Sequence, residues 1–449
     1  MVSLPSELLN ALPDDVQLER SRYRADPLAD NTVSRILGPW PTTPAERKQQ
    51  QQRLAAVTRL FTTWQDNQSL VDWRPQATDL PPDVAQALAD YVREGQKLPE
   101  WADVARVQLA ESLFMEHGVL SCILLFCASL PECYVVPDLA AVLQTTSQLT
   151  AHTEYRVRAT AAMVFPVMTD EGLMGEHGSG IAQILKVRLI HATIRYQILH
   201  GSPQAVLGIQ SATGSIAATP GVQADTNMYQ ALSCMGWDFK ERGLPCNQEE
   251  LAYTLLTFSY VFMRGLRKLG VQLRPLDEDA YLHAWNVVGH ILGVERALMA
   301  DSMEEAAVLF ERLQTRGRKR QIRPDARPAL AKALINTMSA ALPGWITSSF
   351  PQLMTQHLCG PVTSQDLGLR SRVPWLVETA FRALLATVQG LAGLWPGSSS
   401  MNSPLHKLGR SVMAKLLLDQ TKPLQLPGTL QDRVKNVLDH WDRHMKRKN

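Results

Sequence analysis

The sequence predicts an all-α protein with a single large helical domain, and three observations lead to this fold class. Apolar residues recur at helical spacing along most of the chain, and the strict alternation typical of a strand is rare. Proline residues stand at the ends of the apolar stretches, where helices begin or stop. Hydrophobic residues make up 45% of the 449 positions, which is enough for a large core and excludes a disordered chain.

The elements follow from prolines, glycines and apolar spacing in chain order. Residues 1–45 are interrupted by prolines at positions 27, 39, 41 and 44, and they predict an N-terminal arm with short helical pieces. The main domain is expected over 46–395, and residues 396–449 as a helical extension packed on the core. Its expected helices span 46–64, 83–91, 102–130, 138–149, 152–168, 181–200, 248–269, 277–292, 303–312 and 329–341, with more apolar helices after 345. The stretch over 102–130 is expected to form one or two core helices that stop at Pro131, and a Gly-rich turn is expected over 172–180 and a loop or lid over 203–225.

The charge balance and the apolar runs restrict the partners. Lys plus Arg number 45 and Asp plus Glu number 43, so the basic excess of a nucleic-acid-binding protein is absent. The longest nearly apolar run, 118–130, is shorter than the ~20 residues that span a bilayer. The first thirty residues are polar and acidic, without a leader pattern. We therefore expect a cytoplasmic protein, or a secreted one if a leader was removed, with no membrane span, as a monomer or weak oligomer.

Most common catalytic and metal-binding patterns are missing. The sequence has no HExxH, P-loop, GxSxG or GxGxxG pattern, and no CxxCH for covalent haem attachment. None of its His residues follows an acid by three positions, as the ligands of helical di-iron sites do. His283 and His290 share a helix face, but without a third ligand nearby they are expected to be core or surface residues.

The most suggestive segment is the helix around His191. The residues one and two turns away from His191 are apolar: Ile184, Val187, Ile194 and Ile198. A neutral imidazole on an apolar wall is what a haem iron needs on its proximal side, and Arg188 and Arg195 could bind the two haem propionates. The alternatives are a core histidine and two arginines on a solvated helix edge.

A second segment places Arg156 and Thr160 four residues apart on one helix face. The residues beyond them, including Val164 and Phe165, are apolar. An arginine that enters an apolar zone needs an anion or another acceptor, and a polarised dioxygen or a propionate would serve. A structural arginine with a locally bonded threonine is the alternative.

Six ordered pieces of the chain resemble the latex-clearing-protein family of rubber oxygenases and its wider group of haem proteins. The similarity runs from about residue 25 to 316, and its order and spacing are more specific than any single piece. The pieces are ADPLAD (25–30), LPECY (130–134), RxxxT (156–160), VRLIHA (187–192), GLPCNQEE (243–250) and WNVVGHILG (285–293).

The resemblance implies a fold, a cofactor and an activity. Family members hold a non-covalent haem b in a helical core that is similar to a globin, and they use dioxygen to cleave double bonds of polyisoprene into aldehyde and ketone ends. The family's proximal ligand falls on His191, and its distal Arg and Thr fall on Arg156 and Thr160. On this basis we expect a haem-dependent dioxygenase that acts on an apolar alkene, either cis-1,4-polyisoprene or an oligo-isoprenoid.

The sequence also departs from the family pattern. Ala159 stands where polymer-cleaving members carry a lysine that can bind the iron, so we expect an open or water-bound distal side. Ala140 stands at the position of the family's pocket glutamate, which leaves the catalytic base unassigned. A tailoring oxygenase that cleaves a prenyl side chain, or a non-enzymatic haem or gas-binding protein, remains the alternative.

Two finer expectations concern the immediate surroundings of the predicted haem. We expect the Nδ1–H of His191 to donate to the backbone carbonyl of Val187, which would fix the tautomer. The substrate channel is expected to be lined by apolar residues on the neighbouring helices, namely Leu120, Ile123, Leu124, Phe165 and Met168.

Overall fold

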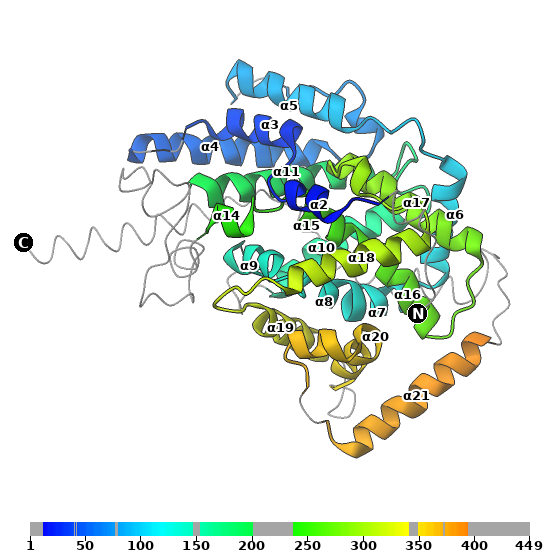
Figure 1. The fold of residues 1–449 in the computed structure, drawn as a ribbon. Coiled ribbons are helices and arrows are strands. Elements are labelled where there is room, and N and C mark those ends of the chain that lie inside the picture. Colours follow the sequence, from blue (N-terminus) through cyan, green and yellow to red (C-terminus); the bar gives the residue numbers. More distant parts are fainter. Residues whose placement is uncertain are drawn as a thin grey trace, which may run out of the picture.

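The computed structural model describes residues 12–39, 41, 43–76, 80–146, 153–200, 237–340, 349–370 and 373–393. Every regular element in these ranges is a helix, which confirms the all-α prediction (Figure 1). The predicted loop over 203–225 and the predicted extension over 396–449 lie outside the described residues.

The N-terminal quarter of the chain forms helices that join the body of the molecule. They are α2 (Asp15–Ser21), α3 (Pro27–Leu37), α4 (Pro44–Leu60), the short 3₁₀ turns η1 (Phe61–Thr63) and η2 (Gln68–Leu70), and α5 (Pro82–Gly95). The side chains of Asp14, Asp26 and Thr43 cap the first three helices, and a proline stands in the first turn of α3, α4 and α5. The segment that the prolines predict as an arm thus consists largely of capped helices, and α3 packs against α5 and α11 (Gly180–His200).

The stretch expected as one or two core helices over 102–130 is bent and locally widened. It forms α6 (Val104–Glu116), α7 (Gly118–Leu124), a π-helical turn η3 (Leu125–Ser129) and α8 (Leu130–Cys133), followed by α9 (Pro137–Thr146). In η3 the Leu130 N–H donates to the carbonyl of Leu125, five residues back. Pro131 occupies the first turn of α8, where its missing N–H costs nothing, so the expected stop at Pro131 is wrong.

The middle of the chain forms helices of very different length, from four residues to the 21 of α11. These are α10 (Thr153–Met168), α11, α14 (Phe239–Arg242), α15 (Gln248–Phe258), α16 (Tyr260–Lys268), α17 (Pro275–Leu292), the turn η4 (Arg296–Leu298) and α18 (Met303–Arg318). The expected helix over 248–269 is divided at Ser259, whose hydroxyl donates to the carbonyl of Leu255 and whose ψ of −77° departs from helical geometry.

The C-terminal helices of the described chain are α19 (Arg327–Ala340), α20 (Phe350–Asp366) and α21 (Trp375–Gly393). Gly360 interrupts α20 with a φ of 86°, which suits glycine just before Pro361. Helix α21 runs along the edge of the molecule (Figure 1) and packs on α20 through a small core of Leu353, Val377 and Phe381.

Helix α17 lies at the centre of the main core, in contact with α6, α11 and α15. Its Trp285 is buried and stacks on Phe258 with ring centroids 5.3 Å apart. Among the described helices no single one is long and apolar enough to cross a membrane; the pair Val104–Glu116 and Leu120–Cys133 would reach the required length and composition together but is bent by 93°.

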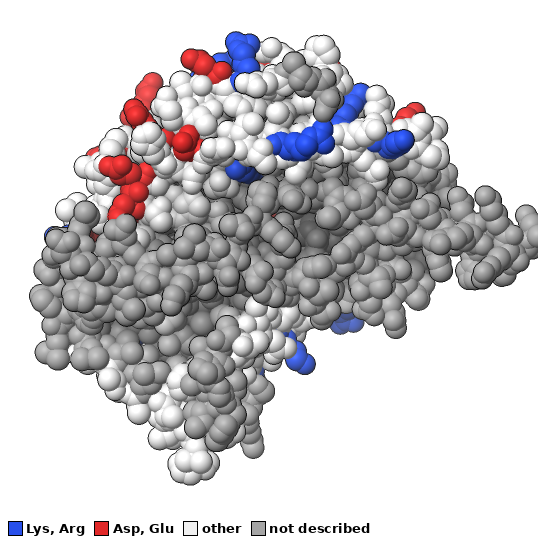
Figure 2. Space-filling model, turned by 180° about the vertical axis from the view of Figure 1, so that it is seen from behind, with Lys and Arg blue, Asp and Glu red and all other residues white. Residues whose placement is uncertain are grey.

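Charged side chains on the face seen in Figure 2 gather near its upper edge, with acidic groups on one side and basic groups on the other. Neither sign forms a continuous stripe over the part of this face that the structure describes.

Candidate functional site

Helix α11 presents two different faces to its surroundings. One face is buried and includes Leu185, Leu189 and Ala192. Another face, formed by Gln183, Val187, Ile190 and Ile194, is only half-buried although three of its four residues are apolar. His191 stands at the edge of this half-buried face, which we call the α11 apolar face.

The imidazole of His191 is neutral and has a free nitrogen. Its Nδ1 atom is buried without a hydrogen-bond partner in the described part of the chain. The expected hydrogen bond from Nδ1 to the Val187 carbonyl is therefore absent. Burial, reinforced by the nearby charge of Arg195, lowers the pKa of His191 to about 4. At neutral pH the ring thus keeps a lone pair for a ligand rather than a second proton.

Arg188 and Arg195 are bound by protein carboxylates, which corrects their predicted role as propionate anchors. Arg188 binds Asp26 through two hydrogen bonds, from Nε to Oδ2 at 2.5 Å and from the terminal NH2 group to Oδ1 at 2.7 Å. Arg195 donates to Asp30 Oδ1 from Nε at 2.9 Å. To bind a propionate, Arg188 would have to leave Asp26 buried and unpaired, which costs several kcal/mol.

The two arginines instead fix α11 against the rest of the fold. Arg188 also donates to the carbonyl of Ile291 at 2.9 Å, and Arg195 to the carbonyls of Pro245 and Cys246 at 3.1 and 2.7 Å. Gly293, with a φ of 89°, leaves room for this joint, since a Cβ there would lie 2.8 Å from Asp26 Oδ2.

Four of the six segments that carry the family resemblance meet at this joint. Asp26 and Asp30 belong to 25–30, Arg188 to 187–192, the Pro245 and Cys246 carbonyls to 243–250, and Ile291 and Gly293 to 285–293. Asp26 and Asp30 were not predicted as partners of the arginines. One sequence feature could have indicated the pairing: the segments that carry the family resemblance contain both acids, Asp26 and Asp30, and one of the two arginines, Arg188.

The start of α11 is held by a second set of polar contacts. The Asn67 side chain donates to the carbonyls of Leu173 and Gly175 and accepts the N–H of Ile181. Glu111 on α6 accepts the N–H groups of Glu171 and Leu173, both at 2.9 Å. The Gly-rich turn before α11 is thus anchored on both sides, and His191 is carried on a helix whose start and middle are both fixed.

Helix α10, which carries Arg156 and Thr160, packs directly against α11. Thr160 is half-buried. The backbone of Arg156 is part of α10, but its side chain lies outside the described residues. The structure thus brings the two predicted helices together, and the roles of Arg156 and Thr160 stay predictions.

The expected channel lining is wrong at three of its five positions. Leu124, Phe165 and Met168 are fully buried in the main core, where Phe165 packs on Phe114 with centroids 6.0 Å apart. Side chains without exposed surface cannot line an open channel. Leu120 and Ile123 are half-buried, as are apolar residues on helices adjoining the site, namely Leu143 on α9, Met163 on α10 and Met338 on α19.

Two other features of the described chain lie apart from this site. A surface hollow between α6 and the Gly-rich turn is lined by Glu111, Glu171, Glu176 and His177, and none of the predicted site residues borders it. In the ranges that the structure describes, no three His, Cys, Asp or Glu side chains gather as ligands for a metal ion. His283 and His290 pack instead on Trp101, with ring centroids 5.6 and 6.1 Å apart.

Residues 108–390 match the family model described as "ER-bound oxygenase mpaB/B′/Rubber oxygenase, catalytic domain". A curated relative, the rubber oxygenase of Streptomyces sp. (strain K30), is 22% identical over 228 residues, which are 51% of this chain and 48% of the relative. The chain thus matches about half the length of this relative.

A solved structure of latex clearing protein in the closed state is similar to this chain in fold. The two superpose with a TM-score of 0.61 at 20% identity, covering 89% of this chain and 91% of the other. At this identity the likeness concerns the fold alone.

Proposed function

The chain belongs to the family of ER-bound oxygenases mpaB/B′ and rubber oxygenases, and from this premise we propose that it is a haem b-dependent oxygenase. It would use dioxygen to cleave carbon–carbon double bonds of an apolar isoprenoid-type substrate, leaving aldehyde and ketone ends. The curated relative named rubber oxygenase supports the substrate class.

The observation that carries the proposal is the state of His191. A histidine with a depressed pKa and an unpartnered buried nitrogen has no structural hydrogen bond that explains it. Coordination of a metal by this imidazole would use a nitrogen lone pair, and the half-buried side chains of Val187, Ile190 and Ile194 would cover part of an apolar macrocycle. The residues present therefore fit a haem b with His191 as its protein ligand.

When bound, the haem would supply the redox chemistry that makes dioxygen reactive toward an alkene. The protein's own contribution is positioning. The Arg188–Asp26 and Arg195–Asp30 pairs hold α11, and thereby His191, in one place. The α11 apolar face would exclude water and favour an apolar substrate.

Arg156 and Thr160 remain our candidates for the catalytic polar groups. Arg156 would donate hydrogen bonds to negative charge that develops on the reacting oxygen atoms, and Thr160 would orient a proton donor or the substrate. The contact between α10 and α11 supports this assignment.

The test is product formation by the full chain supplied with haem. Isoprenoids of graded length are incubated with the protein under isotopically labelled dioxygen, and products are separated by mass. We expect carbonyl products that carry one labelled oxygen atom at each end formed by cleavage. Bound haem without any carbonyl product would assign a non-enzymatic haem protein, and absence of haem binding would overturn the proposal altogether.

A prenyl side chain on a secondary metabolite is the second substrate class, the alternative expected from the sequence resemblance. The family description is consistent with more than one substrate class, because it covers mpaB-type oxygenases as well as rubber oxygenases. The same panel separates the two: a polymer-cleaving enzyme turns over long oligomers, whereas a tailoring enzyme turns over only short prenyl chains on a polar head.

A further inference from the structure

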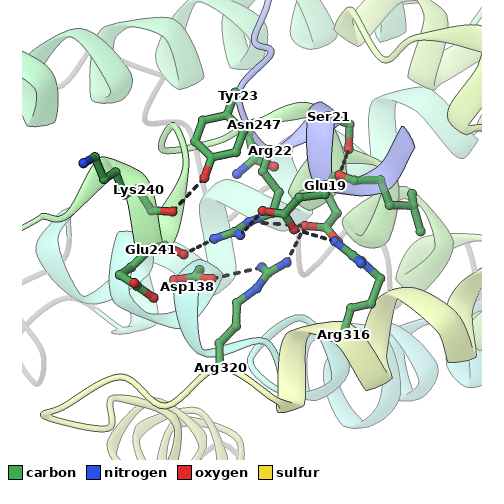
Figure 3. Close-up of polar contacts among 12 residues, drawn as sticks. Glu19, Ser21, Arg22, Tyr23, Asp138, Lys240, Glu241, Asn247, Arg316 and Arg320 are labelled. Carbon is green, nitrogen blue, oxygen red and sulfur yellow. Dashed lines mark hydrogen bonds and ion pairs between the residues drawn. The ribbon is translucent and has the colours of Figure 1, made fainter. Parts of the chain in front are cut away.

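A group of buried acids lies where α9 and α15 begin. Asp138 in the first turn of α9 is fully buried, and Glu249 and Glu250 in the first turn of α15 are nearly so. Arg320 reaches two of the three acids, donating to Asp138 Oδ2 at 3.0 Å and to Glu249 Oε2 at 2.6 Å (Figure 3). Arg316 donates to the other Glu249 oxygen at 2.9 Å. Asp138 and Glu249 thus have cationic partners, whereas Glu250 forms no ion pair with the residues that the structure describes.

Among the residues that the structure describes, three carboxyl oxygens in this group have no hydrogen-bond partner of normal geometry. They are Oδ1 of Asp138 and both Oε atoms of Glu250, and all three are buried. An ionised carboxylate that is buried without a donor costs several kcal/mol, so native proteins rarely keep one. A protonated carboxyl carries its own O–H donor, which can bond a neighbouring carboxylate.

The surrounding charges favour the protonated form at Glu250. Burial, together with the charges of Asp138 and Glu249, raises the pKa of Glu250 to about 8, although Arg320 and the backbone N–H of Cys246 act in the opposite direction. Burial also raises the pKa of Asp138, with Arg320 opposing it. The remaining groups facing Glu250 are Arg242 on α14 and the Cys246 thiol, whose pKa burial raises to about 12.

We propose that Glu250 carries a proton at neutral pH and shares it with the free Oδ1 of Asp138, so that a single proton joins α9 to α15. Loss of this proton in alkaline solution places two carboxylates together in an apolar setting and weakens the joint. Since the two groups interact, they titrate as a pair.

The joint between α9 and α15 lies beside α11, the helix that carries His191. Weakening the joint is therefore expected to affect the packing of α11. Ala141 and Val142 of α9 and Cys246 before α15 form a small apolar core with Ile198 of α11, and the half-buried Ile194 packs against it. This inference does not depend on the proposed haem, because it concerns only protein groups.

Infrared spectroscopy of the full chain tests the proton directly. All samples carry Glu111→Gln, because burial also raises the pKa of Glu111 to about 7 and its acid band would overlap. In this background at pH 7 we expect the carbonyl stretch of a protonated carboxylic acid when Glu250 is present, and its loss in Glu250→Gln. Glu249→Gln is the matched control, since it removes an acid one position away that is bound by two arginines, and the acid band should persist. If the Gln variant does not fold, Glu250→Met fills the same space without polar atoms and should lose the band as well. An acid band of equal strength with and without Glu250 would overturn the proposal.

Urea unfolding as a function of pH provides the second readout. A carboxyl whose folded pKa is raised stabilises the fold fully below its unfolded value, and this stability is lost as pH rises through the folded value. Between about pH 4.5 and 8 the free energy of unfolding of the wild type should therefore fall more steeply with pH than that of Glu250→Gln. The difference between the two slopes should correspond to one proton bound by the folded wild type. Glu249→Gln should show the same loss of stability displaced to lower pH, because the charge of Glu249 no longer raises the pKa of Glu250. Identical pH dependence in the wild type and Glu250→Gln would exclude a proton held at this position.

Discussion

At the scale of single residues, the chemistry of the site rests on a histidine kept neutral and without a hydrogen-bond partner on Nδ1. Burial disfavours the imidazolium, and Arg195 adds a like charge, so the ring stays unprotonated well below neutral pH. A neutral imidazole at the edge of an apolar, half-buried face is suited to bind a metal macrocycle and unsuited to an exposed ion pair.

Replacing this imidazole should abolish haem binding without unfolding the chain. We expect His191→Ala to reduce the Soret absorbance per protein to background while circular dichroism stays helical, because the methyl group cannot ligate iron and Nδ1 of the ring makes no hydrogen bond to the described residues. The exposed His177 and His200 supply the controls. Haem retained in His191→Ala but lost in either control variant would refute the assignment.

Substitutions of Arg156 distinguish an electrostatic role of this side chain in the reaction from a purely structural role. If it stabilises charge on the reacting oxygen atoms, Arg156→Ala should keep haem and lower turnover by about 10²-fold, the usual scale for one lost donor. Arg156→Lys should restore little, because a lysine lacks the planar fork of donors. Steady-state turnover per bound haem is the measurement, and an unchanged value in Arg156→Ala would remove the residue from the reaction.

At the scale of elements, α11 is held by buried ion pairs to α3 and the loop before it. The Arg188–Asp26 pair is bidentate and nearly free of solvent, so its partners depend on each other. Such a pair specifies where α11 sits more than it adds net stability.

Breaking this pair on one side should be strongly destabilising. Arg188→Ala leaves the Asp26 carboxylate buried and unpaired, so we expect a loss of about 3–5 kcal/mol in the free energy of unfolding. Urea denaturation measures it, with Arg382→Ala as control because the Arg382–Glu378 pair is exposed and should contribute at most about 1 kcal/mol. The double variant Arg188→Met with Asp26→Leu should recover part of the loss. Equal effects of Arg188→Ala and Arg382→Ala would contradict the buried-joint interpretation.

The Gly-rich turn before α11 should make stability depend on pH through Glu111. Burial raises the pKa of Glu111 to about 7, even though two backbone N–H groups favour its charged form. The proton on Glu111 contributes fully to the free energy of unfolding below about pH 4.5, and this contribution is lost as pH rises through 7. The full contribution is about 3 kcal/mol. We expect Glu111→Gln to remove this part of the slope in urea unfolding between pH 4.5 and 7.5. A slope in Glu111→Gln as steep as that of the wild type would show that the carboxyl is ionised throughout.

At the scale of the whole molecule, the N-terminal helices are part of the body that carries the site. Helix α3 buries Val33, Ile36 and Leu37 and contributes the acids that pair with both α11 arginines. Tyr23 and Arg22 further bind the carbonyls of Lys240 and Glu241, more than two hundred residues later in the chain (Figure 3).

Removal of this segment should therefore prevent stable folding. A chain that begins at residue 44 loses the cover of α11 and leaves Arg188 and Arg195 buried without carboxylates. We expect it to lose the cooperative thermal unfolding transition seen by circular dichroism, and we expect a co-expressed fragment of residues 1–43 to restore the transition. A truncated chain that unfolds at the wild-type temperature would restore the interpretation of this segment as a dispensable arm.

The sequence by itself determined the local features of this protein. Apolar spacing and proline positions placed most helices within a few residues, since helix formation depends on neighbours along the chain. The same local spacing singled out His191, and the structure gives that residue a depressed pKa. The helix ends that failed, at Pro131 and Ser259, are places where a π-turn or a side-chain hydroxyl rearranges backbone hydrogen bonds.

Only the tertiary structure decided which partner each charged side chain takes. Arg188 finds Asp26 at a separation of 162 residues, and Arg195 finds Asp30 at 165, so no local pattern could assign them to each other rather than to a cofactor. The same holds for Glu250, because only the packing of α9 and α15 buries its carboxyl without a partner among the described residues. It also holds for Phe165, which is fully buried in the main core and therefore cannot line a channel. Helix periodicity fixes the direction of a side chain relative to its own helix, whereas burial and pairing depend on which distant surface that direction meets.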